Sequence, residues 1–298
     1  MTLSIVIVNW NVKPLLERCL ASITQNSRGL DHEVLVIDNN STDGSRDYLR
    51  AMARKRKNLK VFLNKENLGF SKGSNQGIKE AQGEFILLLN PDTEVYVGTL
   101  KKMVKFMKNH QDYGIVGCRL IGSEDTVQPS VRSFPTPGSQ LMIFLKFHYL
   151  FPNAKTLKNY FRYDFNYNRQ SEVDQVMGAF LMTRNKIFKK LGLLDENFYL
   201  WFEEVDFCKR VTAAGWKIVY NPDVQLFHHG SQSFCQMFSL AKQRIYNQSA
   251  IYYFKKHFPF RSYWPLIAFR PVSLFLSYLT QVFHIAQKYE SKRRTRFR

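Results

Sequence analysis

Apolar runs and helical patterns alternate along the first 90 residues of the chain. Short runs rich in Val, Ile and Leu predict buried strands, and apolar positions at helical spacing predict helices between them. Because each strand is apolar on both faces, the pattern favours an α/β fold, a mostly parallel central sheet flanked by helices. The expected strands are 3–8, 34–37, 59–63 and 85–89, and the helices begin at Pro14, Ser45 and Gly69.

The middle of the chain is less regular. Four of its ten prolines and many aromatic residues lie within 123–170, which predicts loops and one short helix near 140–147. Elsewhere we expect helices at 100–108 and 203–214 and strands or strand-like segments at 115–118, 173–182 and 217–220.

The C-terminal stretch combines a helical pattern with a basic end. Between Arg270 and Lys288 lie 17 uncharged residues, about 26 Å as a helix and slightly short for a bilayer. A one-sided polar stripe suits a helix at a surface better than one that spans lipid. With the basic tail at 292–298 it predicts peripheral binding to an anionic membrane surface, although an ordinary core helix with a solvated tail also fits. The stripe consists of Ser273, Ser277, Thr280, Gln281, His284 and Gln287.

The chain contains many more basic than acidic residues. Lys and Arg number 43 against 24 Asp and Glu, a net charge of +19, which favours an anionic partner such as a phosphorylated substrate, a phospholipid surface or nucleic acid. The four cysteines are far apart, so neither a zinc ribbon nor a disulfide scaffold is indicated. The first apolar run has no positive flank and is too short for a signal peptide, so we expect a cytoplasmic protein.

Polar residues follow three of the expected strands. Asn9 and Asn11 follow the first, Asp38 the second, and Asn90 and Asp92 the fourth. In a parallel sheet, ligands bind beyond the carboxyl ends of the strands. Each residue alone could simply cap a helix, but together they predict a binding site. The chain contains no GxGxxG and no P-loop motif, so neither of these nucleotide sites is supported.

Acidic residues cluster at the start of the helix expected at 203–214. Glu203, Glu204 and Asp206 lie beside the aromatic Trp201. Acids complement a helix N-terminus, but a carboxylate among apolar rings also has a pKa raised toward that of a useful general base. Further on, His228 is either structural or joins Asp92 in a divalent-cation site.

Seven segments, in order, resemble the sequence blocks of glycosyltransferase family 2. The similarity covers about residues 3–232 and is closest to bacterial enzymes of rhamnosyltransferase type that build surface polysaccharides. It implies a GT-A fold, a divalent cation (Mg²⁺ or Mn²⁺) and inverting transfer from a nucleotide-sugar donor, with dTDP-rhamnose as a guess, to a saccharide or polyprenyl-linked acceptor. The blocks are 4–11, 36–45, 67–77, 87–92, 178–182, 202–210 and 228–231.

The resemblance also implies site residues. It places Asp92 and His228 at the metal, Glu204 as the catalytic base, and Gly178, Ala179 and Trp201 at the acceptor. Asn90 stands where the family's metal motif begins with Asp, and Glu204 stands where the base is Asp, so Glu203 or Asp206 is the alternative base. The nucleotide sugar would be bound by Asn9, Asn11, Asp38, Asn40, Asn67, Gly69, Asn75, Asn90 and Asp92.

The expected organisation is a GT-A domain over 1–232, with a donor half at 1–95 and an acceptor half at 96–232. A helical, basic extension at 233–298 would hold the enzyme on the inner face of the cell membrane. The alternative is a catalytically inactive scaffold that binds the nucleotide sugar. It is supported by Asn90 and Glu204, each of which stands where the family has Asp. A nucleic-acid-binding protein is disfavoured, because acids crowd the strand-end loops and no known nucleic-acid-binding signature is present.

Overall fold

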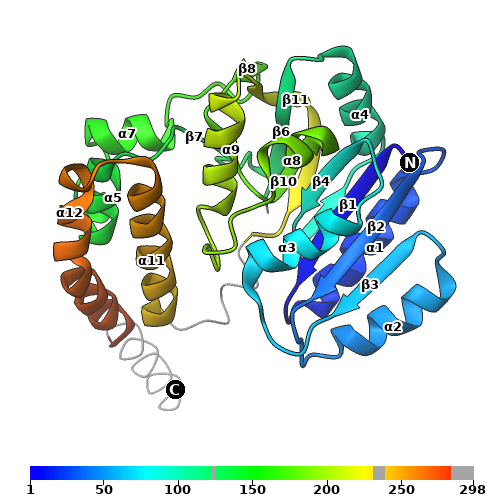
Figure 1. The fold of residues 1–298 in the computed structure, drawn as a ribbon, viewed down its shortest axis with the longest axis horizontal. Helices are drawn as coiled ribbons and strands as arrows, with labels where there is room; N and C mark the ends of the chain where they lie inside the picture. The colour runs from blue at the N-terminus through cyan, green and yellow to red at the C-terminus, as the bar shows by residue number, and fades with distance from the viewer. Residues whose placement is uncertain (123–124, 231–238, 283–298) are drawn as a thin grey trace, which may run out of the picture. The chain divides into compact units, whose positions relative to one another are not determined.

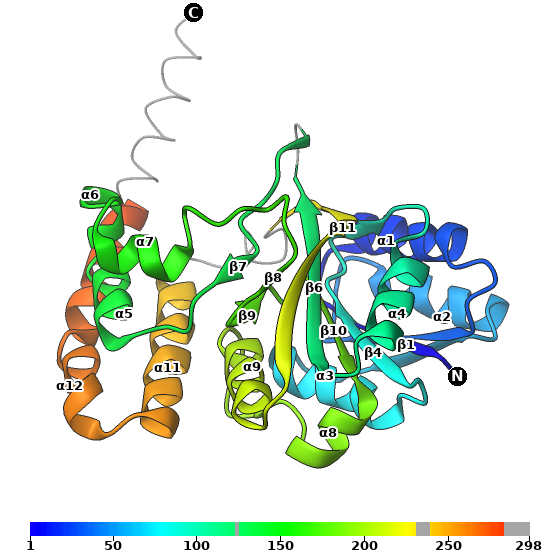
Figure 2. The same cartoon turned by 90° about the horizontal axis from the view of Figure 1, so that it is seen from above.

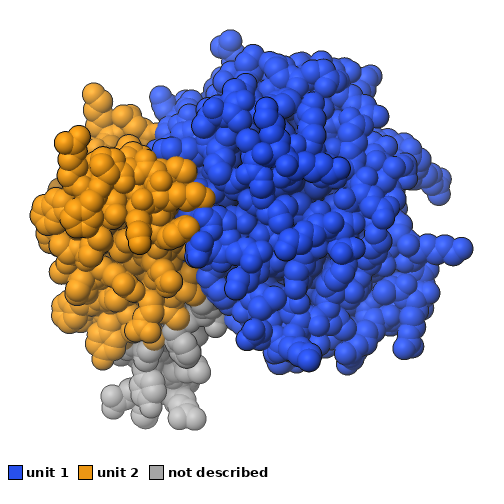
Figure 3. All heavy atoms as spheres, viewed as in Figure 1, with its two compact units in different colours: residues 1–134, 161–233 blue, residues 135–160, 234–298 orange. Residues whose placement is uncertain are grey.

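The structure is a computed structural model that describes residues 1–122, 125–230 and 239–282. The chain divides into two compact units, coloured separately in Figure 3. Unit 1 comprises 1–134 and 161–233, and unit 2 comprises 135–160 and 234–298. Unit 2 thus includes a segment from the middle of the sequence as well as the C-terminal part. The functional division at 232/233, and that at 95/96, stay predictions.

Unit 1 is built on a nine-stranded sheet. Its first three strands pair in parallel, as expected for buried apolar strands joined by helices. β10, β5 and β8 run antiparallel to their neighbours, so the sheet is mixed, and its other six strands run in one direction. The strand order is β3 (Leu59–Leu63), β2 (His32–Asp38), β1 (Leu3–Asn9), β4 (Phe85–Leu89), β10 (Phe180–Arg184), β6 (Tyr113–Ile121), β11 (Lys217–His228) and β5 (Thr93–Val95), with β8 (Ser171–Glu172) beside β11.

Helices cover both faces of this sheet, as Figures 1 and 2 show. On one face the core includes apolar residues of α1 (Lys13–Asn26), α2 (Ser45–Lys55) and α4 (Thr99–Asn109). On the other it includes those of α3 (Gly69–Glu80), α8 (Asn185–Leu191) and α9 (Glu203–Ala213). A small second sheet pairs β7 (Val131–Arg132) with β9 (Gln175–Val176). The layered α/β architecture predicted from the sequence is confirmed.

Close packing explains two of the three glycines in α3. A Cβ added at Gly77 would lie 2.6 Å from Val6 Cγ1, and one at Gly73 would lie 3.0 Å from Val8 Cγ1. The helix can therefore approach β1 only because these side chains are absent. Gly69 differs, because its φ of +83° belongs to the left-handed region that favours glycine.

Two strands differ from the expected ones. The segment 173–182 is not one strand, because a turn at residues 178–179 separates β9 from β10. β11 is longer than expected and continues past an irregularity between Asn221 and Gln225 to His228. Its last residues pair with β5, a three-residue strand that the sequence pattern did not predict. This pairing matters for the site.

Unit 2 is helical. It contains α5 (Pro137–Phe144), α6 (Phe147–Leu150), most of α7 (Lys155–Phe161), α11 (Ser239–His257), α12 (Phe260–Ala268) and a further helix over 270–282. Part of the expected polar stripe turns toward α11: Ser273 and Ser277 are buried and Gln281 accepts a bond from the Leu240 amide, whereas Thr280 is exposed. His284, Gln287 and the basic tail lie outside the described residues. Within the described chain, no helix combines the length and apolar character that crossing a bilayer requires.

Candidate active site

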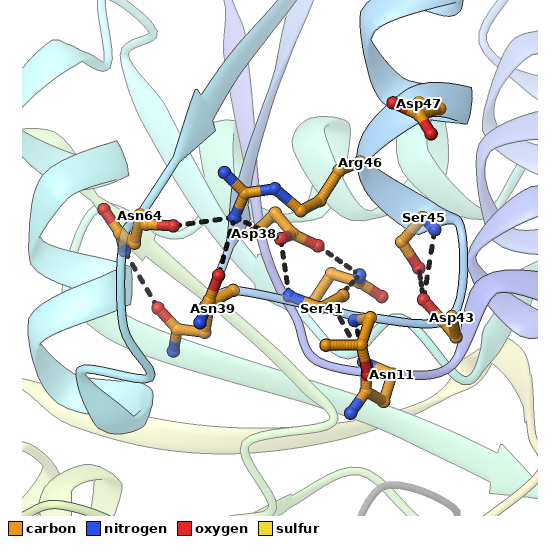
Figure 4. A network of polar contacts seen from close by, with 12 residues as sticks. Asn11, Asp38, Asn39, Ser41, Asp43, Ser45, Arg46, Asp47 and Asn64 are labelled. Atoms are coloured by element: carbon orange, nitrogen blue, oxygen red, sulfur yellow. Dashed lines mark hydrogen bonds and ion pairs between the residues drawn. The ribbon is translucent and has the colours of Figure 1, made fainter.

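A buried polar network lies at the carboxyl ends of β1 and β2 (Figure 4). Asp38 is fully buried and accepts hydrogen bonds from Asn9 Nδ2 (2.8 Å) and the Ser41 amide (2.9 Å). Arg46 Nη1 lies 3.5 Å from Asp38 Oδ1 and donates to the carbonyl of Asn64 (2.7 Å). A buried carboxylate needs such partners to stay charged. Asp38 therefore shapes the loop after β2, and Arg46 is a cationic residue of this site that the sequence did not single out.

Two asparagines in the loops that follow β1 and β2 have left-handed backbone conformations, with φ of 53° for Asn11 and 61° for Asn40. Asparagine adopts this region more readily than most residues. The Asn11 amide donates to Ser41 Oγ (2.9 Å), and Asn11 Oδ1 accepts from the Thr42 amide (2.7 Å). These bonds tie the loop after β1 to the loop after β2, so the structure brings Asn9, Asn11, Asp38 and Asn40 together as predicted.

The remaining amides connect the donor-side loops to α3. Asn39 Nδ2 donates to the Gly69 carbonyl (2.9 Å), and Asn67 Oδ1 accepts from the Gly69 amide (3.0 Å). Asn75 instead bonds Leu194 through both ends of its amide and also Glu196, so it holds α3 to the chain before α9. A nucleotide contact by Asn75 remains a prediction.

The pairing of β5 with β11 brings Asp92 to His228. Thr93 is the register partner of His228, and the His229 amide donates to the Asp92 carbonyl (2.9 Å). His228 Nε2 lies 3.5 Å from Asp92 Oδ1, and both side chains are almost completely buried. The next pair along, His229 and Glu94, contacts at 2.7 Å. The structure thus unites the two residues proposed as metal ligands.

The contacts of Gln128 show that Nδ1 of His228 carries a hydrogen. Gln128 Nε2 donates to the His228 carbonyl (2.9 Å), so its Oε1 is the group 2.7 Å from His228 Nδ1. An amide oxygen can only accept, so Nδ1 carries the hydrogen. Nε2 has no hydrogen-bond partner among the described residues. Nε2 therefore lies free of other hydrogen bonds to the described chain, next to the Asp92 carboxylate, where a metal ion could bind to both groups.

The pair fits a divalent cation in chemistry. Carboxylate oxygen and imidazole nitrogen are both ligands for Mn²⁺ and related ions, and a hydrogen bond at the second ring nitrogen is the usual support for such a ligand. Among the described residues, no group of three or more His, Cys, Asp or Glu side chains is placed to hold a metal. The protein would thus supply two ligands and leave the others to substrate oxygens or water.

The three acids of α9 have different surroundings. Asp206 is fully buried and accepts from Arg210 Nε (2.9 Å), whose other nitrogens donate to the carbonyls of Leu191 and Leu193. Glu203 is buried and Glu204 half-buried. Each has one carboxylate oxygen with no hydrogen-bond partner in the described chain. Asp206 therefore anchors the helix, whereas the two glutamates keep acceptor capacity.

Burial raises the pKa of both glutamates. For Glu203, desolvation and the adjacent Glu204 carboxylate raise the pKa well above its usual range. For Glu204, desolvation also raises the pKa, but backbone hydrogen bonding and the charge of Arg132 on β7 act against it. Of the two, Glu204 is the one better able to carry the negative charge that a general base needs.

Of the residues expected at the acceptor, Trp201 comes just before α9, and Gly178 and Ala179 form the turn before β10. The Asn90 amide donates to the Ala179 carbonyl (3.2 Å), so the end of β4 is joined to the turn at residues 178–179. A Cβ added at Gly178 would meet nothing within 4 Å. Trp201 and Phe202 have φ of 64° and 71°, an uncommon pair of left-handed bulky residues immediately before Glu203. Such strained segments are concentrated at functional sites.

Comparison with known proteins identifies the family. The sequence model described as "Glycosyl transferase family 2" matches residues 4–192. The chain belongs to glycosyltransferase family 2. An N-acetylglucosaminyl-diphospho-decaprenol L-rhamnosyltransferase of Mycobacterium tuberculosis is 26% identical over 244 residues, covering 78% of this chain and 77% of the relative. A low-salt glycan biosynthesis hexosyltransferase of Haloferax volcanii is 24% identical, covering 70% of this glycosyltransferase and 61% of the relative.

Solved structures share the fold of this glycosyltransferase. A mannosyltransferase of Pyrobaculum calidifontis in complex with GDP-Man and Mn²⁺ superposes with a TM-score of 0.57 at 17% identity, covering 95% of this chain and 75% of that one. The TarS protein of S. aureus in complex with UDP has a TM-score of 0.55 at 18% identity, covering 84% and 65%. The GT-A fold expected from the sequence is confirmed.

The buried ion pair in α9 predicts a stability effect for this glycosyltransferase. Asp206→Asn should lower the free energy of unfolding by about 3 kcal/mol, because it leaves the Arg210 charge without its buried partner. Urea unfolding followed by circular dichroism measures this. The control is Asp112→Asn, which breaks a half-exposed pair with Lys217 and should leave the midpoint unchanged. Equal midpoints for Asp206→Asn and wild type would contradict the anchoring role.

Proposed function

We propose that this glycosyltransferase moves a sugar, with inversion, from a nucleotide-sugar donor to a hydroxyl of a lipid-linked saccharide in cell-surface polysaccharide synthesis. The observation that carries the proposal is the half-buried Glu204, which has an unpartnered carboxylate oxygen within the described chain. It lies in the first turn of α9, in the same unit as the Asp92–His228 pair. A base and a site for a charged leaving group are the two elements that such a transfer requires.

The relatives support the class of acceptor and donor. The mycobacterial relative is named as a rhamnosyltransferase acting on N-acetylglucosaminyl-diphospho-decaprenol, a lipid-linked sugar. A Campylobacter jejuni glucosyltransferase named for an undecaprenol-linked acceptor is 32% identical over 104 residues, 35% of this chain. We infer a polyprenyl-diphosphate-linked saccharide as the acceptor and dTDP-rhamnose as the first donor to test. Such an acceptor would place the reaction at the inner face of the cell membrane.

Asp92 and His228 would hold Mg²⁺ or Mn²⁺ at the donor diphosphate. A divalent cation there stabilises the negative charge that accumulates on the departing nucleoside diphosphate. Gln128 keeps the His228 ring in the tautomer whose Nε2 can bind the cation. The Arg46 guanidinium, Asn11 and Asn40 line the nucleotide end of the donor pocket in this proposal.

Glu204 would act as the general base. Its carboxylate takes the proton of the acceptor hydroxyl while that oxygen attacks the anomeric carbon and the bond from that carbon to the diphosphate oxygen breaks. No covalent enzyme intermediate is formed. The charge of Arg132 acts to lower the pKa of Glu204, whereas burial beside a second carboxylate raises the pKa of Glu203 well above its usual range. Asp206 is occupied by Arg210.

Glutamine substitutions distinguish the roles of the two glutamates in transfer. Glu204→Gln should reduce kcat by at least about 100-fold, because it removes the base. Glu203→Gln preserves the neutral form and should retain most of the activity. Transfer is measured by release of nucleoside diphosphate with a short-chain polyprenyl-diphosphate saccharide as acceptor. Near wild-type turnover in Glu204→Gln, with Glu203→Gln inactive, would move the base to Glu203.

The melting temperature of the protein with different nucleotides identifies the nucleotide class of the donor. A ligand that binds only the folded protein raises the melting temperature. At a concentration 100 times its dissociation constant, one of UDP, GDP, dTDP or CMP should raise it by about 5 °C. The rise should require Mn²⁺ or Mg²⁺ and should be lost in Asp92→Ala. No rise with any nucleotide would contradict the proposed donor site, and binding without turnover would identify an inactive scaffold.

A further inference from the structure

The helix at 270–282 of unit 2 buries polar side chains against α11 and exposes apolar ones, although apolar residues elsewhere in the unit are buried as well. Asn247 Nδ2 donates to Ser273 Oγ (3.0 Å), and Ser277 Oγ donates to Gln243 Oε1 (3.1 Å). All four side chains are buried. A surface helix of a water-soluble protein normally has the opposite arrangement, with its apolar stripe packed against the core. Helices in lipid use such buried polar side chains to bind one another.

The outer side of α12 and the helix at 270–282 is apolar. Trp264, Phe275 and Tyr278 are 51%, 59% and 54% exposed. Together with Ile267 and Val282 they recur at intervals that place them along one side of the helices. We call this set the apolar face. Its members are Phe260, Trp264, Ile267, Phe269, Val272, Phe275, Tyr278 and Val282. Exposed apolar side chains gathered on one side of neighbouring helices are typical of an interaction site.

Charge identifies the kind of partner. Unit 2 contains 15 Lys and Arg against one acid, Glu290, so it carries +14 of the chain's net +19. Unit 1, with 28 Lys and Arg against 23 acids, carries only +5. The described residues of unit 2 include no acid at all. A second copy of so basic a surface would be repelled, whereas an anionic surface would be attracted.

We propose that the apolar face of unit 2 inserts into the headgroup and acyl boundary of an anionic phospholipid bilayer. Trp264 and Tyr278 are the residue types that favour this boundary. Arg261 and Arg270, the only charged residues of 260–282, can extend their guanidinium groups to the lipid phosphates. The inference rests on the proposed function, since a lipid-linked acceptor is presented at such a surface. It reverses the expected geometry, because the polar stripe packs inside the unit.

Vesicle binding of the full chain tests this. Sedimentation with vesicles of equal parts phosphatidylglycerol and phosphatidylcholine should retain the wild type, and Trp264→Glu with Phe275→Glu should weaken binding by about tenfold or more. The matched control, Val97→Glu with Tyr163→Glu, adds the same charge at exposed apolar positions of unit 1 and should bind as the wild type does. A wild type that stays in the supernatant, or equal binding by both double variants, overturns the proposal.

Tryptophan quenching locates the contact. Phosphatidylcholine brominated in its acyl chains should quench part of the wild-type emission, and Trp264→Phe should abolish that quenching whereas Trp216→Phe should not. Quenching that persists in Trp264→Phe overturns the assignment. Sedimentation velocity supplies a second test. If the wild type self-associates, and the double glutamate variant loses that association but binds vesicles as before, then a second copy covers the apolar face and the proposal is overturned. Stabilisation by a nucleotide is measured without vesicles and does not depend on membrane binding. If no nucleotide stabilises the protein, that result overturns the proposed function alone.

Discussion

Two buried acceptors that face each other, the carboxylate of Asp92 and Nε2 of His228, are the interaction on which the active-site account depends. Nε2 and Asp92 Oδ1 lie 3.5 Å apart with almost no access to water, so each depends on the other or on a shared cation for its polar interaction. The protein maintains this arrangement at both ends. Antiparallel pairing of β5 with β11 holds the backbones, and Gln128 holds the ring. The structure thus holds both side chains in place before any substrate arrives.

The rest of unit 1 arranges other groups around this site. The network of Asp38 and Arg46 fixes the loops where a nucleotide would lie, and the backbone bond from Asn90 to Ala179 joins that side to the acceptor turn. On α9, Asp206 bonds Arg210, whereas Glu204 keeps a carboxylate oxygen without a hydrogen-bond partner in the described chain. This division of roles separates three carboxylates that the sequence presents as equivalent candidates.

Sequence patterns predicted what depends on local periodicity and missed what depends on pairing between distant segments. The strands 59–63 and 85–89 match β3 and β4 because each is short, apolar and bounded by turns. β5 has only three residues, so no periodicity could reveal it or the contact that it makes with His228. Gln128 lies in an irregular loop, and its role follows from a backbone carbonyl that sequence does not show. The C-terminal stripe was visible as a pattern, but its direction depends on Gln243 and Asn247 in another helix.

Direct Mn²⁺ binding, followed by electron paramagnetic resonance on the full chain, tests the central claim. The wild type should bind Mn²⁺ in the presence of the stabilising nucleoside diphosphate, and Gln128→Leu should weaken that binding by about 10- to 100-fold, because Nε2 is no longer held as the free ring nitrogen. Gln140→Leu, which removes a buried amide from unit 2, is the control and should bind as the wild type does. A wild type that binds no Mn²⁺, or a Gln128→Leu variant with unchanged affinity, would contradict the account.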